Sequence, residues 1–318
     1  MSAITGVLAW PYPWGANGGK SWTPVNGATC LYDTKTRLPQ ILISKRLYQT
    51  AKSWNLKNQL GKLQSVPACA EGGARFAVIG DTEPGRFLFS RLLWGRPGVA
   101  KTLIRNIQKE RIEFSVQLGD MVSCGTEQHY GNFFEKLSSL KPSAPYLSVL
   151  GNHDRRYPHG VADAALYEEL LAPANHYFDR GLCRFIFVDT TAGGVNAAQI
   201  EWLNRALNTT LTKIVFIHIP PMQVKSLLPW GRGGFIKGSE DFVNLMSDCR
   251  VARVYMGHVH GFGISEYQGV RYVLSGGGGS PLYPSPLQRF YHFITVDASP
   301  EGVHETVHCL DGKSFYLA

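Results

Sequence analysis

The sequence predicts an α/β fold in which buried strands form a sheet that is flanked by helices. Short apolar runs suited to buried strands alternate along the chain with longer stretches of helical periodicity. Polar residues of the kinds that bind metals follow directly after several of the apolar runs. Because ligands bind at the carboxyl ends of strands in such sheets, these polar residues are expected to meet at one edge.

The length and charge of the chain narrow the class of protein. A chain of 318 residues forms one large domain or a core with an appendage, and its net charge of +8 favours anionic partners. No apolar run approaches about 18 residues, so no transmembrane segment is predicted. The first residues lack the basic start and the long apolar core of a secretory signal. We therefore expect a cytoplasmic protein, with a peripheral position on a membrane as the alternative.

Residues 1–73 are predicted to form an N-terminal arm and a basic amphipathic helix, followed by the main domain at 74–318. Residues 1 to about 30 are rich in Gly, Pro, Trp and Asn, which predicts an irregular arm. Residues 38–63 combine an apolar stripe, which includes Leu47 and Trp54, with several lysines. Two interpretations stay open: the stripe packs on the main domain, or the helix lies on an anionic membrane.

Within the main domain, the pattern of apolar residues predicts the elements in order. Strands are expected at residues 76–79, 114–118, 146–150, 185–189, 213–217, 253–256 and 272–275. Helices are expected between several of them, at roughly 87–110, 127–140, 161–172, 196–208 and 239–249. The glycine run 276–279 and the prolines after it predict a loop near the edge where the polar residues meet.

Five short motifs carry these polar residues. They are GDTE at 80–83, GD at 119–120, GNHD at 151–154, His218 after IVFI, and GHVH at 257–260. Asp, Asn and His together suit a borderline-hard divalent metal ion. Four of the motifs begin with glycine, which is consistent with backbone that bends closely around a pocket. The motifs therefore predict a metal site.

The order and spelling of the motifs resemble the calcineurin-like metallophosphoesterase superfamily over roughly residues 74–298. The usual pattern of that superfamily is D-x-H, G-D, G-N-H-D/E, a lone His and G-H-x-H. The resemblance implies a four-layer α/β/β/α sandwich of two mixed sheets flanked by helices, with an N-terminal extension. It also implies a metal-dependent hydrolase, a phosphatase or a phosphodiesterase, that cleaves a phosphoester with metal-activated water.

The family pattern further implies a ligand set for two divalent ions. Asp120 would bridge the two ions. The other ligands would be Asp81, Glu83 and His260 at the first ion and Asn152, His218 and His258 at the second. Two His separated by one residue in extended chain share a face, and a slight turn aims each at a different ion.

Other residues near the motifs are expected to act on the substrate. His153 would stabilise charge in the transition state or protonate the leaving oxygen, and Asp154 would orient its imidazole and raise its pKa. Arg86, Arg155 and Arg232 lie close to the motifs or in the loop after His218, and are predicted to bind a phosphate oxygen of the substrate.

Glu83 departs from the family pattern, which has His at this position. A carboxylate in place of an imidazole makes the ligand set of the first site chemically harder. A harder ligand set favours Mn²⁺, with iron, Mg²⁺ and Zn²⁺ as alternatives. Glu83 either ligates the first ion, directly or through water, or turns away and leaves that ion weakly held. The residue three after Asp120 is Ser123, so the tyrosine ligand of purple acid phosphatases is missing.

The expected substrate is a phosphorylated small molecule or a lipid-linked phosphate ester. Nucleic acid is the second choice, because no basic groove interleaved with aromatic residues is evident. Peripheral membrane contact, if present, would use residues 38–63. The alternative function is a binding scaffold on the same fold whose catalysis has lapsed, since Glu83 stands where the superfamily has a ligand.

Overall fold

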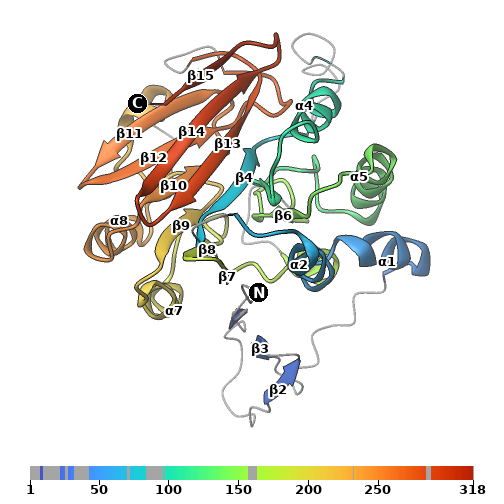
Figure 1. Cartoon of the computed structure of the whole chain (residues 1–318), viewed down its shortest axis with the longest axis horizontal. Helices are drawn as coiled ribbons and strands as arrows, with labels where there is room; N and C mark the ends of the chain where they lie inside the picture. The colour runs from blue at the N-terminus through green and yellow to red at the C-terminus, as the bar shows by residue number, and fades with distance from the viewer. Residues whose placement is uncertain are drawn as a thin grey trace.

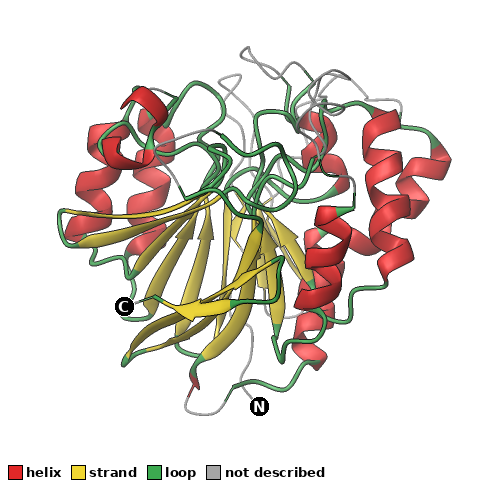
Figure 2. Ribbon diagram, turned by 90° about the horizontal axis from the view of Figure 1, so that it is seen from above, coloured by secondary structure: helices red, strands yellow, loops and turns green. Residues whose placement is uncertain are grey.

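The structure, a computed structural model, describes three short N-terminal strands and most of the chain after residue 42 (Figure 1). The described residues are 8–9, 22–25, 28–31, 43–69, 72–83, 96, 98–156, 163–231, 233–283 and 288–317. Within them, two mixed sheets lie in the middle of the molecule with helices on both sides (Figure 2). This arrangement confirms the predicted four-layer sandwich.

The first sheet has seven strands in the described part of the chain. Their order is β1 (Leu8–Ala9), β7 (His176–Arg180), β8 (Cys183–Phe187), β9 (Thr212–Phe216), β10 (Arg253–Met256), β12 (Val270–Ser275) and β11 (Phe262–Tyr267). The four strands from β8 to β12 run parallel, and β1, β7 and β11 are antiparallel to their neighbours. The parallel strands therefore end at one edge.

The second sheet has six strands, again within the described part of the chain. Their order is β15 (Ser314–Tyr316), β14 (Gly302–Cys309), β13 (His292–Ser299), β4 (Ala74–Ile79), β5 (Phe114–Gln117) and β6 (Tyr146–Ser148). Strands β4, β5 and β6 run parallel, and the other pairs are antiparallel. Ligand motifs follow β4, β5 and β6 in this sheet and β9 and β10 in the first.

The two sheets meet through aromatic side chains. In β8, Phe185 belongs to the core between the sheets, whereas its neighbour Ile186 belongs to the core under the outer helices. This alternation is the two-residue period of a strand. The ring of Phe76 in β4 packs edge-on against Phe185 at 5.4 Å and against Phe216 at 5.9 Å. The sheets are therefore held in contact along the strands that lead to the motifs.

Helices cover the outer face of each sheet. The helices of the described residues are α1 (Lys45–Ala51), α2 (Leu56–Ser65), α4 (Val99–Ile107), α5 (Glu127–Leu140), α6 (Ala165–Leu170), α7 (Ala197–Leu207) and α8 (Ser239–Asp248). Single 3₁₀ turns lie at η1 (Lys52–Trp54), η3 (Lys225–Leu227) and η4 (Pro229–Gly231). Helices α7 and α8 pack on the seven-stranded sheet, and α4 and α5 lie on the side of the six-stranded sheet (Figures 1 and 2).

The basic amphipathic segment is two helices rather than the single helix predicted over 38–63. Asn55 separates them, because its extended backbone (ψ 154°) ends η1 and its side chain caps α2 by accepting from the N–H of Asn58 at 2.9 Å. Leu47 and Trp54 of the apolar stripe are buried against the main domain. The stripe is therefore occupied by the protein's own core, and the lysines face outward.

A buried ion pair ties these helices to both sheets. The guanidinium of Arg180 in β7 donates to Glu113 at 2.6 Å and to the carbonyl of Val66, just after α2, at 2.7 Å. The other carboxylate oxygen of Glu113 accepts from the N–H of Arg75 in β4 at 3.0 Å. Because such a charge is costly to leave unpaired, the end of α2 is fixed to the main domain.

The irregular arm predicted for residues 1–30 contains regular structure. Strand β1 pairs with β7, and β2 (Trp22–Val25) pairs with β3 (Ala28–Leu31) in a two-stranded hairpin. Short strands of two to four residues show too little alternation to be found by periodicity. None of the described helices is both long and apolar enough to span a bilayer.

His176 is expected to make the stability of the fold depend on pH. Its ring stacks on Phe187 at 4.4 Å, and burial lowers the pKa of its imidazole to about 4. The neutral form therefore stabilises the fold above the ordinary pKa of about 6.5, and this contribution is lost as the pH falls toward 4. Between pH 7 and 4.5 this one group should cost about 2 kcal/mol.

Urea unfolding at several pH values measures this effect. The variant His176→Phe keeps the stacking but has no proton to gain, so its stability should fall by about 2 kcal/mol less than that of the wild type over the same range. The exposed His304 offers the control, since His304→Gln should follow the wild-type profile. Equal pH dependence of His176→Phe and the wild type would contradict the prediction.

Candidate metal centre

Five loops at the ends of parallel strands converge on one site. Asp81 follows β4 and Asp120 follows β5, and both belong to the six-stranded sheet. His218 follows β9 and His258 follows β10, and both belong to the seven-stranded sheet. The site therefore lies where the carboxyl-terminal ends of strands from two sheets meet, which is where ligands bind in open α/β sheets.

Three of these residues have a backbone conformation that side chains rarely adopt. Of the described residues, six besides glycine have positive φ, and they include Asp81 (53°), Asp120 (52°) and His258 (69°). Hydrogen bonds between the loops hold them there: the N–H of His258 donates to Asp81 Oδ1 at 3.0 Å, and that of His153 to Asp120 Oδ1 at 2.9 Å. Backbone strain of this kind concentrates at functional sites.

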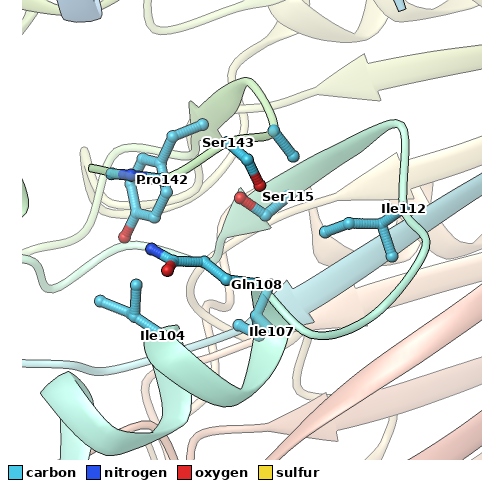
Figure 3. A pocket seen from close by; sticks show the side chains of 9 residues that line it. Ile104, Ile107, Gln108, Ile112, Ser115, Pro142 and Ser143 are labelled. Atoms are coloured by element: carbon cyan, nitrogen blue, oxygen red, sulfur yellow. The ribbon is translucent and has the colours of Figure 1, made fainter. Parts of the chain in front are cut away.

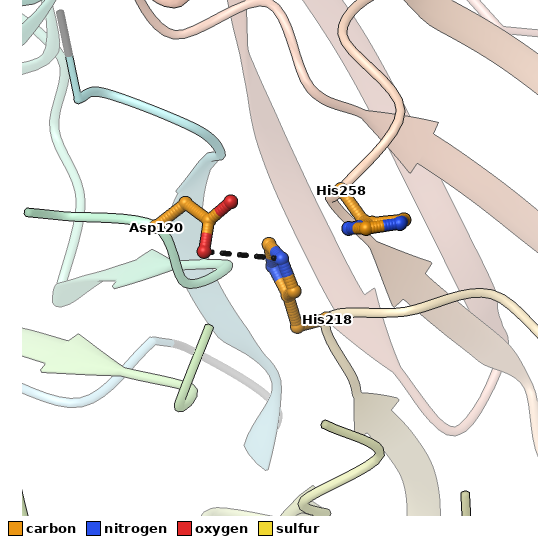
Figure 4. Close-up of side chains that lie close together, drawn as sticks. All are labelled: Asp120, His218 and His258. Atoms are coloured by element: carbon orange, nitrogen blue, oxygen red, sulfur yellow. Dashed lines mark ion pairs between the residues drawn. The ribbon is translucent and has the colours of Figure 1, made fainter. Parts of the chain in front are cut away.

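One cluster of candidate ligands contains Asp120, His218 and His258, whose ligand atoms all lie within 4.8 Å of one another (Figure 4). His218 Nε2 lies 3.3 Å from Asp120 Oδ1. Asn152 joins this cluster, because its Oδ1 lies 2.9 Å from His218 Nε2 and 2.9 Å from His258 Nδ1. The structure thus brings together the four residues predicted to surround the second ion.

A second cluster contains Asp81, Asp120 and His260 within the same 4.8 Å limit. His260 Nε2 lies 3.5 Å from Asp81 Oδ1. Asp120 belongs to both clusters, which is the position of a carboxylate that bridges two ions. The side chains of Asp81 and Asp120 are both buried, and burial raises the pKa of Asp81 well above its ordinary value, so an ion that binds beside it must displace a proton. At Asp120 the effect of burial is outweighed by His218, which lowers the pKa of Asp120.

The spacing of these atoms fits metal ions. Two ligand atoms that each lie about 2.1 Å from one ion, at a right angle, are about 3 Å apart. The separations from Asn152 Oδ1 to the two imidazoles (2.9 Å) and from Asp120 to His218 (3.3 Å) match that value. The mixture of carboxylate, amide and imidazole donors suits divalent ions of intermediate hardness. The residues present therefore fit a pair of such ions.

Backbone carbonyls set the direction of two imidazoles. His218 Nδ1 lies 2.6 Å from the carbonyl oxygen of Leu118, and His260 Nδ1 lies 2.8 Å from that of Pro281. A ring that donates from Nδ1 presents the lone pair of Nε2, and in both residues Nε2 faces the carboxylates. Such contacts behind the ligand fix its orientation and raise its basicity.

The electrostatics of the site also suit a cation. Burial lowers the pKa of His258 to about 3 and that of His260 to about 4, so both imidazoles are neutral, the form that binds metals. Burial acts in the same direction on His218, but the carboxylates of Asp120 and Asp81 outweigh it and raise the pKa of His218 to about 9. An ion that binds there must displace this proton.

Glu83 lies beside the clusters and belongs to neither of the two that the described residues form. Its side chain is 2% exposed, and its Oε1 lies 3.6 Å from Nδ1 of His153. The ligation of the first ion by Glu83 stays a prediction. The His153 side chain is 19% exposed, so part of its imidazole faces solvent beside the site.

Asp154 has a different contact from the one predicted. Its Oδ1 accepts from the N–H groups of Met121 and Val122 at 2.8 and 3.1 Å, and its Oδ2 accepts from the N–H of Gly151 at 2.8 Å. The expected orientation of His153 by Asp154 is therefore replaced by a link between two ligand loops. The carboxylate near the His153 imidazole is that of Glu83.

Of the three arginines predicted to bind substrate, the described residues include only Arg155. Arg155 is buried, where its guanidinium pairs with Asp189 and donates from Nε to Thr191 Oγ1 at 2.7 Å. These contacts fix the loop after the GNHD motif and direct the charge into the protein. Arg86 and Arg232 lie outside the described residues.

The glycine-rich loop contributes contacts that the motifs did not reveal. The N–H of Gly278 donates to the carbonyl of Gly80 at 2.7 Å, and the N–H of Ser280 to that of Asp81 at 2.9 Å. The ring of Tyr283 lies 4.9 Å from that of His260 and is 38% exposed. Only the glycine run itself signals this close approach, because a carbonyl that accepts a hydrogen bond carries no signature in the sequence.

A separate small cavity lies between α4 and the loop before β6 (Figure 3). Its volume is about 10 Å³, and residues such as Ile104, Ile107 and Pro142 line it. That volume is at most the space of one water molecule. In the part of the chain that the structure describes, none of the predicted site residues lines it, so it is not a candidate for substrate binding.

Many solved structures share this fold, among them two phosphatases and an anchor protein. A purple acid phosphatase from yellow lupin (Lupinus luteus) has a TM-score of 0.61 and 18% identity over 79% of this chain, which spans 54% of that enzyme. GAP50, the anchor in the inner membrane complex of Plasmodium, has a TM-score of 0.54 and 17% identity. The match covers 77% of this chain and 88% of that one. A dimetal phosphatase from Danio rerio has a TM-score of 0.56 and 14% identity. The match covers 77% of this chain and 98% of that one.

At these identities the likeness to solved structures shows the fold alone. A comparison with curated proteins finds no match. The family model described as Calcineurin-like phosphoesterase matches residues 74–262, which is more than half of the chain and includes every residue of the two clusters. The chain therefore belongs to the calcineurin-like phosphoesterase family.

Proposed function

We propose that this protein hydrolyses a phosphoester with two divalent metal ions held between the ends of its two sheets. The observation that supports this most is the pair of clusters that share Asp120, with His153 on the adjoining turn. The ligands would be Asp81, Asp120 and His260 for the first ion and Asp120, Asn152, His218 and His258 for the second.

Bound ions would acidify a water molecule and neutralise the phosphoryl oxygens of the substrate. His153 would protonate the leaving group, because the bond from its backbone N–H to Asp120 places the residue beside both clusters. In the reaction the water oxygen bonds to phosphorus and the P–O bond to the leaving group breaks. His153 would give a proton to the leaving oxygen, the attacking water would release its proton to solvent, and His153 would regain a proton from solvent.

The proposed substrate is a phosphorylated small molecule or a lipid-linked phosphate ester. The net charge of +8 favours an anionic substrate without choosing between a monoester and a diester. The oxygen ligands Asp81, Asp120 and Asn152 beside three imidazoles favour Mn²⁺, with iron, Mg²⁺ and Zn²⁺ as alternatives. A panel of phosphorylated metabolites, nucleotides and lipid-linked phosphates, assayed with Mn²⁺, identifies the class.

Addition of Mn²⁺ to metal-stripped protein is expected to stabilise the fold and to switch on hydrolysis. An ion at about 100 times its Kd adds about 2.7 kcal/mol, which for a chain of this size raises Tm by about 4 °C. Thermal unfolding with and without Mn²⁺ measures the shift, and release of nitrophenol from a nitrophenyl phosphate ester measures the activity. Activity that persists in excess chelator would contradict the proposal.

The second candidate function is a binding scaffold on the same fold. Its support is the position of Glu83, which stands where the family has His and belongs to neither cluster. The fold is also compatible with such a role, since the Plasmodium structure of similar fold is described as an anchor. Purified protein without bound metal, and with a Tm that Mn²⁺ leaves unchanged, would favour the scaffold over the hydrolase.

A further inference from the structure

The carboxylate of Glu83 occupies a fixed and buried position beside His153. The N–H of Glu83 donates to the carbonyl of Asp120 at 3.0 Å, and the hydroxyl of Ser280 donates to the carbonyl of Glu83 at 2.7 Å. These bonds attach its backbone to two neighbouring loops. The side chain is 2% exposed, and its Oε1 lies 3.6 Å from Nδ1 of His153.

The backbone of His153 is also held in place. Its backbone N–H donates to Asp120 Oδ1 at 2.9 Å, and its neighbour Asn152 contacts both His218 and His258. The backbone that carries the ring therefore has a defined place relative to the proposed ligands of the second ion. Since the two ring nitrogens point in different directions, a carboxylate near Nδ1 leaves Nε2 as the atom that serves the substrate.

We propose that Glu83 is a positioning residue for His153 and not a metal ligand. Its carboxylate accepts from Nδ1–H, holds the ring in one orientation and so directs the Nε2 proton toward the leaving oxygen. The separation of 3.6 Å exceeds a hydrogen bond, but such contacts commonly shorten when substrate binds. The first ion is then held by Asp81, Asp120 and His260.

This inference rests on the proposed hydrolysis and names a consequence for its substrates. When the P–O bond breaks, an alkoxide leaving group is a strong base and needs the proton from Nε2, whereas nitrophenolate leaves readily without one. Loss of the Glu83 carboxylate should therefore slow alkyl esters much more than nitrophenyl esters. General acid catalysis of this kind is worth about 10²–10⁴-fold.

The test compares Glu83→Gln with the wild type on an alkyl phosphate and on a nitrophenyl phosphate. We expect kcat for the alkyl ester to fall about 10²-fold. The fall in kcat for the nitrophenyl ester should be smaller by a factor of at least about ten. KM and the number of bound Mn²⁺ ions should stay near the wild-type values. Equal losses on both esters, or the loss of one bound ion, would overturn the proposal.

A double-mutant cycle separates positioning from a structural effect. His153→Asn should show the same preference for the nitrophenyl ester, and adding Glu83→Gln to it should cause no further loss, because both changes remove one function. Additive losses would overturn the proposal. The count of bound Mn²⁺ does not depend on turnover, so an inactive wild type would reject the hydrolysis while the count still decides whether Glu83 is a ligand.

Discussion

Replacement of Asp120 by alanine is expected to abolish the proposed hydrolysis, with a fall in kcat of at least about 10³-fold. Asp120 is the one residue that both clusters contain, so its loss affects both ions at once. Each ion is worth several kcal/mol of charge stabilisation in the transition state, and each 1.4 kcal/mol is tenfold in rate. His218 also loses the carboxylate 3.3 Å from its Nε2.

Steady-state kinetics and elemental analysis of the purified variant measure this effect. Bound Mn²⁺ should fall below the two ions expected for the wild type, and the rise in Tm on adding Mn²⁺ should shrink. Asp248→Ala provides the matched control, because Asp248 is an exposed carboxylate at the end of α8 and should change neither quantity. Full activity of Asp120→Ala with two bound ions would reject the assignment of the metal centre.

Replacement of Gly151 by alanine should also damage the site, in this case through the backbone. A Cβ on Gly151 would lie 2.0 Å from the backbone N of Asp120 and 2.3 Å from its Oδ1, so one of the two loops must move. Overpacking of this kind costs about 1–3 kcal/mol of stability. Displacement of the Asp120 carboxylate should also lower kcat by at least about 10²-fold, because a shift of about 1 Å is enough for that.

Gly131→Ala is the matched control for this substitution. Gly131 lies within α5, and a Cβ added there meets nothing within 4 Å. Alanine should therefore stabilise the helix by about 0.5–1 kcal/mol and leave metal binding unchanged. Urea unfolding and Mn²⁺ titration of both variants supply the readout. If Gly151→Ala bound Mn²⁺ as tightly as Gly131→Ala, the close approach of the two loops would be wrong.

Helix α5 shows that the bounds of an element could be predicted from the sequence alone. Helix α5 begins and ends at the predicted residues, Glu127 and Leu140, because Thr126 caps it and apolar residues repeat with helical spacing. Strands β13 and β14 were not predicted. In β14 the buried position 305 is occupied by Glu305, which pairs with Arg253 from the other sheet. The sequence of this strand therefore does not alternate cleanly between apolar and polar residues.

The candidate ligands were predictable for a different reason. Each follows the end of a strand, and parallel strands bring such positions to a common edge whatever their separation in the chain. The roles of Asp154 and Arg155 were not predictable. Asp154 contacts backbone N–H groups, which every residue except proline has, and Arg155 pairs with Asp189 on the other sheet. Contacts of these kinds produce no recognisable pattern of residue spacing in the sequence.

The two proposed ions would each join residues from opposite halves of the sandwich. Asp81, Asp120 and Asn152 extend from one sheet and His218, His258 and His260 from the other, so the coordination bonds act as cross-links at a single edge. The other contacts between the sheets, apolar packing and ion pairs such as that of Arg253 with Glu305, do not depend on the metal. Metal depletion should therefore loosen the molecule at this edge first, with faster amide hydrogen exchange in the five loops than in the strands below them.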